Sequence, residues 1–158
     1  MAKELKTNAM RFLEKYKIDY TVQSYQCDEF IDGIDVAEKL NQPIDETFKT
    51  LVLHGKSGNY YCFLLPVAFE LDLKKAAKSV GEKSVEMIHV KDINKITGYV
   101  RGGCTPIGMK KQFMTVIHNS AEKLELFYIS GGRIGTQIKL SPHKLIDAIN
   151  GKFEDIIQ

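Results

Sequence analysis

The chain has few cysteines, and they are not grouped. Cys27, Cys62 and Cys104 are the only three among 158 residues, and their spacing matches neither a zinc-ligand pair nor a C-x-x-C motif. An odd number of scattered cysteines argues against a disulfide framework and indicates reduced thiols in a cytoplasmic protein. We therefore expect neither a metal nor any other cofactor.

A charge excess and long apolar runs are also missing. The 22 basic and 20 acidic residues nearly cancel, so any contact with nucleic acid has to be local. No apolar run reaches membrane-spanning length, and the first 17 residues alternate charged and apolar side chains where a signal peptide would be continuously apolar. The sequence predicts a protein that is neither exported nor bound to a membrane.

The common catalytic motifs are absent. The sequence contains no Walker loop, no G-x-G-x-x-G after a strand and no G-x-S-x-G. The four histidines fall at predicted strand ends or helix starts, where structural roles are more frequent. Cys104 lies in a glycine-rich segment, but no histidine or acidic residue lies near it in sequence to lower its pKa. No conventional nucleophile is predicted.

The length and the 44% of hydrophobic residues suffice for one domain over residues 1–158. Periodicity and capping signals predict helices over residues 5–16, 33–41, 72–80, 92–97 and 142–150. Alternation and β-branched residues predict strands over residues 18–25, 48–54, 59–66, 85–88, 114–118, 124–130 and 136–140. Short strands outnumber helices, and most connections are too short for helical crossovers, so we predict an α+β fold with a mixed or antiparallel sheet.

Lys49 begins an otherwise apolar predicted strand, over residues 48–54. One interpretation is an edge lysine whose stem covers apolar surface while its ammonium reaches water. The other is a fixed cation that points into a pocket. The residues around Lys49 leave both interpretations open.

Two segments are richer in glycine than a turn requires. Residues 98–108 contain four glycines and one proline, either as a plain connector or because Gly102 and Gly103 let the main chain approach a ligand. Residues 128–135 form a plausible hairpin loop, which accounts for the glycines but not for Ser130 or Arg133. A hydroxyl at the end of a strand is a common way to present a hydrogen bond to a ligand.

Taken in order and spacing, residues 48–51, 71–75, 98–111 and 130–133 resemble the YbaK/EbsC family, and the similarity runs from the first predicted helix to the last. Members of this family are free-standing relatives of the editing domain of bacterial prolyl-tRNA synthetase. The resemblance implies Cys-tRNA(Pro) deacylation. It also implies a mixed, mostly antiparallel sheet that curls towards a barrel and has flanking helices.

The resemblance also implies the site residues. Lys49 corresponds to the essential, catalytic lysine of the family. The residues implied to bind substrate are Tyr25, Thr50, Gly102, Gly103, Pro106, Ser130, Gly131 and Arg133. The chain departs from the family in having Arg133 where relatives often have lysine, and Gln137 where some have an acidic residue.

The family mechanism accounts for the missing nucleophile. In deacylases of this type the substrate's own cysteine thiol attacks the aminoacyl ester. The implied partners are the aminoacylated end of tRNA and prolyl-tRNA synthetase, and the basic residues that could contact acceptor-stem phosphates are Lys74, Lys75, Lys78, Lys110 and Lys111. Two alternatives stay open: a deacylase for another mischarged tRNA, such as Ala-tRNA(Pro), and a non-catalytic module that binds a nucleotide or an aminoacyl-tRNA.

Overall fold

The computed structural model describes residues 6–25, 32–149 and 151–158. The helices in these ranges are α1 (Asn8–Lys15), α2 (Gly33–Lys39), α3 (Leu73–Ser79), α4 (Ile93–Thr97) and α5 (Pro142–Ile149). The strands are β1 (Tyr20–Ser24), β2 (Phe48–Gly55), β3 (Tyr60–Pro66), β4 (Val85–Met87), β5 (Met114–His118), β6 (Phe127–Ser130), β7 (Thr136–Leu140) and β8 (Lys152–Glu154). None of the described helices is long and apolar enough to cross a membrane.

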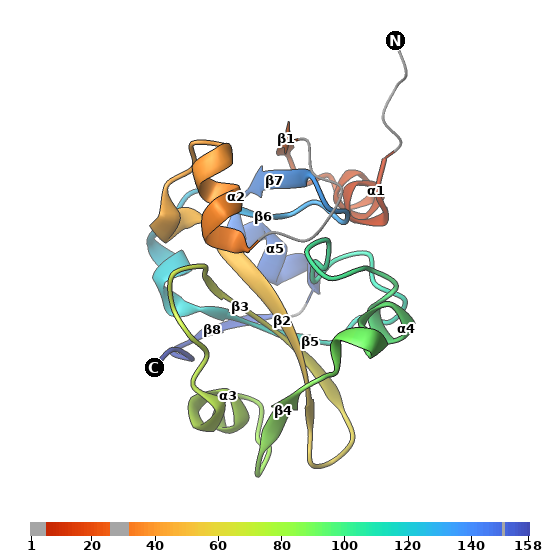
Figure 1. The fold of residues 1–158 in the computed structure, drawn as a ribbon, viewed down its shortest axis with the longest axis vertical. Helices are drawn as coiled ribbons and strands as arrows, with labels where there is room; N and C mark the ends of the chain where they lie inside the picture. The colour runs from red at the N-terminus through yellow and green to blue at the C-terminus, as the bar shows by residue number, and fades with distance from the viewer. Residues whose placement is uncertain (1–5, 26–31, 150) are drawn as a thin grey trace.

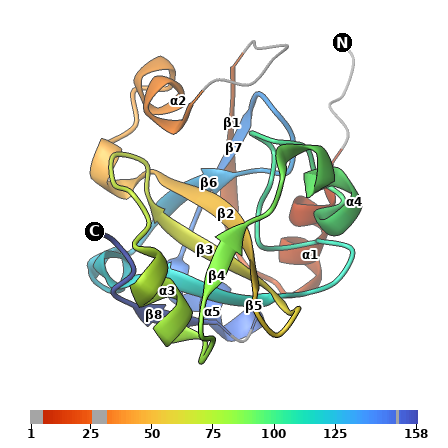
Figure 2. The same ribbon diagram turned by 60° about the horizontal axis from the view of Figure 1, so that its bottom comes forward.

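The strands form two sheets (Figures 1 and 2). The smaller sheet has the order β1-β7-β6 and is antiparallel throughout, while the larger has the order β4-β2-β3-β5-β8. In the larger sheet β2 pairs antiparallel with β3 and β4, whereas β5 pairs parallel with β3 and β8. An isolated bridge between Thr47 and Tyr128 connects the two sheets without closing them into one barrel. The α+β class and the predominance of antiparallel pairing are confirmed.

The helices begin where the capping residues of the sequence place them. The Asp72 carboxylate accepts hydrogen bonds from the backbone N–H groups of Lys74 and Lys75 and so caps α3. At α1 the Thr7 hydroxyl accepts from the N–H of Met10, and the helix starts at residue 8, three residues after the predicted start. Residue 5 itself lies outside the described ranges.

The core is divided by the larger sheet. Along β3, Cys62 and Leu64 pack into a cluster shared with the smaller sheet, α1 and α5, while Phe63 and Leu65 pack on the other face against α3. These four side chains are fully buried. A strand that is buried on both faces is continuously apolar, as the sequence of β3 is. The buried β3 pairs with β2 and so holds β2 in place.

Candidate active site

The N-terminal half of β2 has an open edge. Its outer neighbour β4 pairs only with Leu53–Gly55, and the last bond to this edge runs from the N–H of Ile88 to the carbonyl of Val52. Backbone groups of successive residues in a strand point to opposite edges, so the N–H and C=O of Thr50 point the same way as those of Val52. No described strand pairs with this edge between the Thr47 bridge and Val52, so Thr50 presents main-chain groups there.

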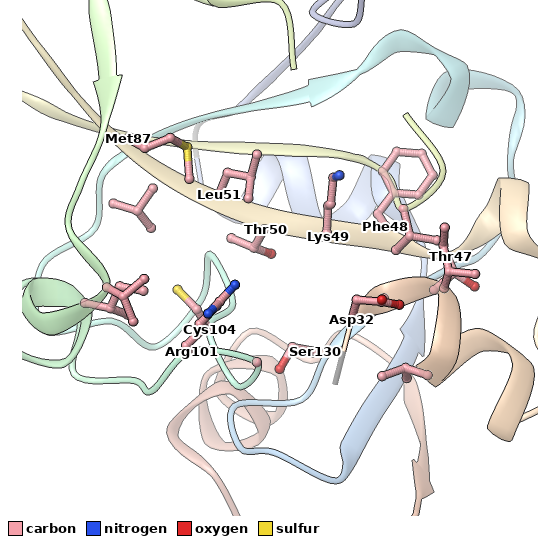
Figure 3. Close-up of a pocket in the computed structure, with 18 of the residues that line it drawn as sticks. Asp32, Thr47, Phe48, Lys49, Thr50, Leu51, Met87, Arg101, Cys104 and Ser130 are labelled. Carbon is pink, nitrogen blue, oxygen red and sulfur yellow. The ribbon is translucent and has the colours of Figure 1, made fainter. Parts of the chain in front are cut away.

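A cavity of about 470 Å³ lies along this open edge (Figure 3). Its size is in the range of small-molecule sites. Its walls are the start of α2, β2, the segment between β3 and α3, the chain from β4 to the loop around residue 102, and the adjoining ends of β6 and β7. Its polar and charged lining residues are Asp32, Thr47, Lys49, Thr50, Glu70, Arg101, Ser130 and Gln137. Five segments that are distant in sequence therefore meet at one site.

Lys49 lines the cavity, and its charge has no partner in the part of the chain that the structure describes. Figure 3 shows Lys49 and Thr50 leaving β2 in opposite directions, with Thr50 directed towards Arg101 and Cys104. Both residues are among those that line the cavity. The partly buried Lys49 ammonium forms no hydrogen bond or ion pair with any residue that the structure describes. This placement agrees with both interpretations of the sequence, because Lys49 lies in the half of β2 with an open edge and also lines the cavity.

Two buried polar atoms in the cavity wall have no hydrogen-bond partner. They are Thr50 Oγ1 and Gln137 Oε1. Beside them the Ser130 hydroxyl accepts one bond, from the N–H of Gly132 at 3.3 Å, and its own proton is directed to no described acceptor. A buried polar group without a partner costs about 1–3 kcal/mol. The wall therefore suits a ligand that supplies several hydrogen-bonding groups.

The glycines of the two loops have different tasks. Gly102 lines the cavity with a φ of +85°, which a residue with a side chain adopts at a cost. Gly103 lies behind it, and a β-carbon there would be 2.8 Å from the Cα of Arg133. Gly131 and Pro106 are buried and do not border the cavity. These last three residues shape and join the loops, while Gly102 faces the space for a ligand.

The N-terminus of α1 holds the two loops together. The Thr7 hydroxyl donates to the carbonyl of Gly131 at 2.5 Å. A β-carbon on Gly108 would be 2.6 Å from the carbonyl carbon of Asn8, and one on Gly132 would be 3.0 Å from Cβ of Thr7. Both glycine-rich loops thus pack on the same turn of α1, where only glycine leaves enough room.

Two other predicted site residues lie next to the cavity wall and not in it. Tyr25 follows β1, and its N–H donates to the carbonyl of Gly135 at 2.8 Å. The Nε of Arg133 donates to Thr136 Oγ1 at 3.1 Å. Of the nine residues predicted from the sequence, four line the cavity among the described residues, namely Lys49, Thr50, Gly102 and Ser130.

Three charged lining residues were not predicted from the sequence as site residues. Asp32 caps α2 by accepting from the N–H of Asp35 at 2.9 Å, and Figure 3 shows it near Ser130. Arg101 directly precedes Gly102 in the first glycine-rich loop, so its position in the sequence could have identified it as a candidate site residue. Glu70 lies between β3 and α3 with no local pattern around it.

The cavity contains no activated protein nucleophile among its lining residues. Cys104 lines it, but burial raises the pKa of its thiol to about 11, so the neutral thiol predominates near pH 7. No histidine is among the lining residues, and the described part of the chain holds no cluster of three or more metal-ligating side chains. The chemistry that this site supports is the binding, orientation and polarisation of a ligand.

Comparison with known sequences points to one family. The family model of the aminoacyl-tRNA editing domain matches residues 32–148. A protein of Enterococcus faecalis, named as a candidate Cys-tRNA(Pro)/Cys-tRNA(Cys) deacylase, EbsC, is 43% identical over 152 residues, which cover 96% of this chain and 93% of that protein. A proline–tRNA ligase of Thermosipho africanus is 34% identical over 76 residues, or 48% of this chain and 13% of the ligase.

Comparison with solved structures shows the same fold. The crystal structure of a candidate trans-editing enzyme for prolyl-tRNA synthetase superposes with a TM-score of 0.82 at 20% identity, covering 98% of this chain and 99% of that one. A hypothetical protein of known structure superposes with a TM-score of 0.87 at 19% identity, covering 96% and 99%. The fold therefore recurs at low sequence identity.

Proposed function

The chain belongs to the aminoacyl-tRNA editing domain family, and we propose that it is a trans-editing deacylase that hydrolyses mischarged Cys-tRNA(Pro). The observation that carries the proposal is the ammonium of Lys49, which has no partner among the described residues and lies on a cavity whose described lining has unpaired hydrogen-bonding groups and no activated nucleophile. The 43% identity to a candidate deacylase over nearly the full length of both chains supports the same reaction. The protein is then an aminoacyl-tRNA hydrolase, acting on an ester.

Substrate binding uses groups that have hydrogen-bonding capacity left over among the described residues. Lys49 binds the terminal ribose or phosphate of the tRNA or polarises the ester carbonyl. The Thr50 N–H at the open edge and the Ser130 hydroxyl are donors for the oxyanion that develops on that carbonyl. Removal of one such donor from other enzymes costs about 2.7–4 kcal/mol of transition-state stabilisation. Gly102 lets the main chain come close to the aminoacyl group.

The reactive thiol belongs to the substrate in this proposal. The cysteine sulfur attacks the ester carbonyl, the new C–S bond replaces the C–O bond to the tRNA, and the thiol proton goes to the departing 3′ oxygen. Water then opens the resulting thiolactone to free cysteine. Holding the thiol and the ester in an attack geometry supplies about 7–11 kcal/mol of the barrier in favourable cases. A site without a nucleophile of its own is sufficient for this reaction.

The test is a deacylation panel with Cys-, Ser- and Ala-tRNA(Pro). We expect loss of the ester from Cys-tRNA(Pro) and little from the other two, because serine and alanine lack the thiol. Lys49→Ala should lower the rate on Cys-tRNA(Pro) by about 100-fold or more. Lys56→Ala is the matched control, because Lys56 is an exposed lysine in the turn between β2 and β3, away from the cavity.

Any other result of the deacylation panel would contradict a specific part of the proposal. Activity on Ala-tRNA(Pro) equal to that on Cys-tRNA(Pro) would contradict thiol assistance and indicate attack by water. Tight tRNA binding without single-turnover ester loss would make the protein a binding module. Equal rates for Lys49→Ala and the parent would show that the proposed site is wrong.

We also propose prolyl-tRNA synthetase as a partner and a cytoplasmic location. The similarity of half the chain to a proline–tRNA ligase supports a shared substrate, and aminoacyl-tRNA is made and used where translation takes place. Gel filtration of the protein with prolyl-tRNA synthetase, with and without tRNA(Pro), tests the partnership. Separate elution of the two proteins under both conditions would contradict it.

A further inference from the structure

The positive charge of the chain is concentrated in one segment. Residues 90–112 contain five basic residues and one acidic residue, a formal charge of +4, whereas the whole chain carries +2. The remaining residues therefore sum to −2. The net charge of the chain is close to zero, but residues 90–112 carry a local excess of positive charge. A local excess of this kind is typical of a surface that binds a polyanion on an otherwise neutral protein.

Four lysines of this segment lie together on the surface. The backbone N–H of Lys110 donates to the carbonyl of Thr97 at 3.1 Å, and its Nζ lies 3.5 Å from the carbonyl of Lys95, so the chain after the glycine-rich loop packs against α4. Lys91 lies in the 3-10 turn just before α4, and Lys111 follows Lys110. We call these four residues the α4 lysine cluster.

The charges of the α4 lysine cluster are not neutralised. All four side chains are exposed, and none forms an ion pair with any residue in the described ranges. The segment's acidic residue, Asp92, is one residue from Lys91. Exposed ammonium groups without acidic partners make this stretch of surface positive, which attracts an anion.

The same segment forms one wall of the cavity. Val90, Ile93, Arg101 and Gly102 line the cavity, and they alternate along the chain with the lysines of the cluster. Ile93 and Lys95 are two residues apart on a helix and therefore lie on different faces of it. The inner side of this wall borders the cavity, and its outer side carries the lysines.

The lysines of α3 differ from the cluster mainly in their distance from the cavity: Lys74 and Lys78 are also exposed and have no ion pair among the described residues, and only Lys75 is paired. Lys75 Nζ bonds to Asp155 at 3.0 Å and to the carbonyl of Ile157 at 2.9 Å. No residue of α3 lines the cavity, and Figures 1 and 2 both show α3 well separated from α4. Of the basic residues predicted to contact phosphate, the structure separates Lys110 and Lys111 from the α3 set and places Lys91 and Lys95 beside them.

We propose that the α4 lysine cluster binds the phosphates of the RNA strand whose 3′ end enters the cavity. The inference rests on the proposed function, because that function requires an RNA end in the cavity. An RNA strand that leaves the cavity across the wall formed by residues 90–112 meets the four lysine ammonium groups first. Lysine is a point charge with three rotatable donors, which suits sequence-independent contact with phosphate.

The test compares two charge reversals of equal size. One variant carries Lys91→Glu and Lys111→Glu, and the matched control carries Lys74→Glu and Lys78→Glu on α3. Binding of uncharged tRNA(Pro) is measured between about 50 and 200 mM salt. We expect the first variant to bind at least about tenfold more weakly, with a log–log salt slope smaller by about one to two, and the control to change less than about twofold.

Two further measurements keep the outcomes distinct. The milder pair Lys91→Gln and Lys111→Gln guards against misfolding and should show the same effect at smaller size. Cysteinyl adenosine ester, which has no phosphate, should be cleaved equally by the parent and all variants. If the parent fails to cleave this ester or Cys-tRNA(Pro), the proposed function fails, whereas the tRNA binding data still decide the role of the cluster.

Equal weakening by the α3 and α4 reversals would overturn the inference, because it would show a general charge effect. Unchanged tRNA binding by the α4 reversal, together with lost binding to prolyl-tRNA synthetase, would overturn it in favour of a protein contact.

Discussion

The Cα of Arg133 lies 2.8 Å from the point where a β-carbon on Gly103 would stand. This contact joins the two glycine-rich loops, 98–108 and 130–135, back to back beside the cavity. The position of Gly102 in the cavity wall therefore depends on how closely Gly103 packs behind it. Gly102 and Gly103 are adjacent in the sequence but differ in their roles. Gly102 faces the cavity, whereas Gly103 packs against the second loop.

Gly103→Ala should lower both stability and deacylation. The new methyl group meets backbone atoms of Arg133, which cannot turn aside, and overpacking of this kind costs about 1–3 kcal/mol. Urea unfolding measures the stability and ester loss the activity. Gly58→Ala is the control, because its φ of +94° gives a backbone cost while no atom lies within 4 Å. A fully active Gly103→Ala enzyme would contradict the coupling of the two loops.

Thr50→Val should separate stability from activity. Valine has the shape of threonine and removes a buried hydroxyl oxygen that has no partner, so the free energy of unfolding should stay equal or rise by about 1 kcal/mol. Deacylation should fall by about tenfold if this hydroxyl bonds to the substrate. Thr50→Ser keeps the hydroxyl and should keep most of the rate. A decrease in stability with unchanged activity would show a structural role for the hydroxyl.

Cys104 should react slowly with iodoacetamide near neutral pH. Burial disfavours the thiolate and raises the pKa of Cys104 to about 11, so the reactive form increases only as the pH approaches that value. Peptide mass spectrometry at a series of pH values follows this residue separately from Cys62. Cys104→Ser should retain deacylation, since the proposed thiol is the substrate's. Loss of activity in that variant, with an intact fold, would indicate a protein nucleophile.

His118 should make the fold less stable in mild acid. Burial is the main cause that lowers the pKa of His118, although Asp155, 3.6 Å from Nε2, opposes it. As the pH falls through about 6.5 the unfolded chain therefore takes up a proton before the folded one does, and the free energy of unfolding decreases. Urea unfolding at pH 7.5 and 5.5 measures this change. His118→Gln should reduce it, and the exposed His89 provides the control His89→Gln. An equal pH effect in the His118→Gln protein would assign it to other groups.

The fold could be predicted from the sequence wherever the signal is local. Asp72 and Ser141 mark helix starts by side-chain bonds to nearby N–H groups, and the continuously apolar run of β3 identifies a strand buried on both faces. Strand β8 was missed because Lys152–Glu154 has three residues and pairs parallel with the distant β5, which leaves no pattern in its own sequence.

The candidate site could be predicted only in part, because some of its features depend on contacts between distant segments. Lys49 and Ser130 stand out locally, as a charge in an apolar strand and a hydroxyl at a strand end. The open edge beside Thr50 depends on where β4 stops pairing with β2, and the turning of Gly103 away from the cavity depends on Arg133. Such relations between distant segments are set by packing, and no short stretch of sequence contains them.

The hydrogen bond between Thr7 and Gly131 limits how far this domain can be truncated at its N-terminus. The match to the editing-domain family model begins at residue 32 and does not include α1, yet α1 supports both loops at the cavity. Transplanting residues 32–148 alone into another protein would leave the carbonyl of Gly131 without its hydrogen bond and Gly108 without its neighbour. The stretch that the family model matches is thus shorter than the stretch that must fold together to keep the cavity in shape.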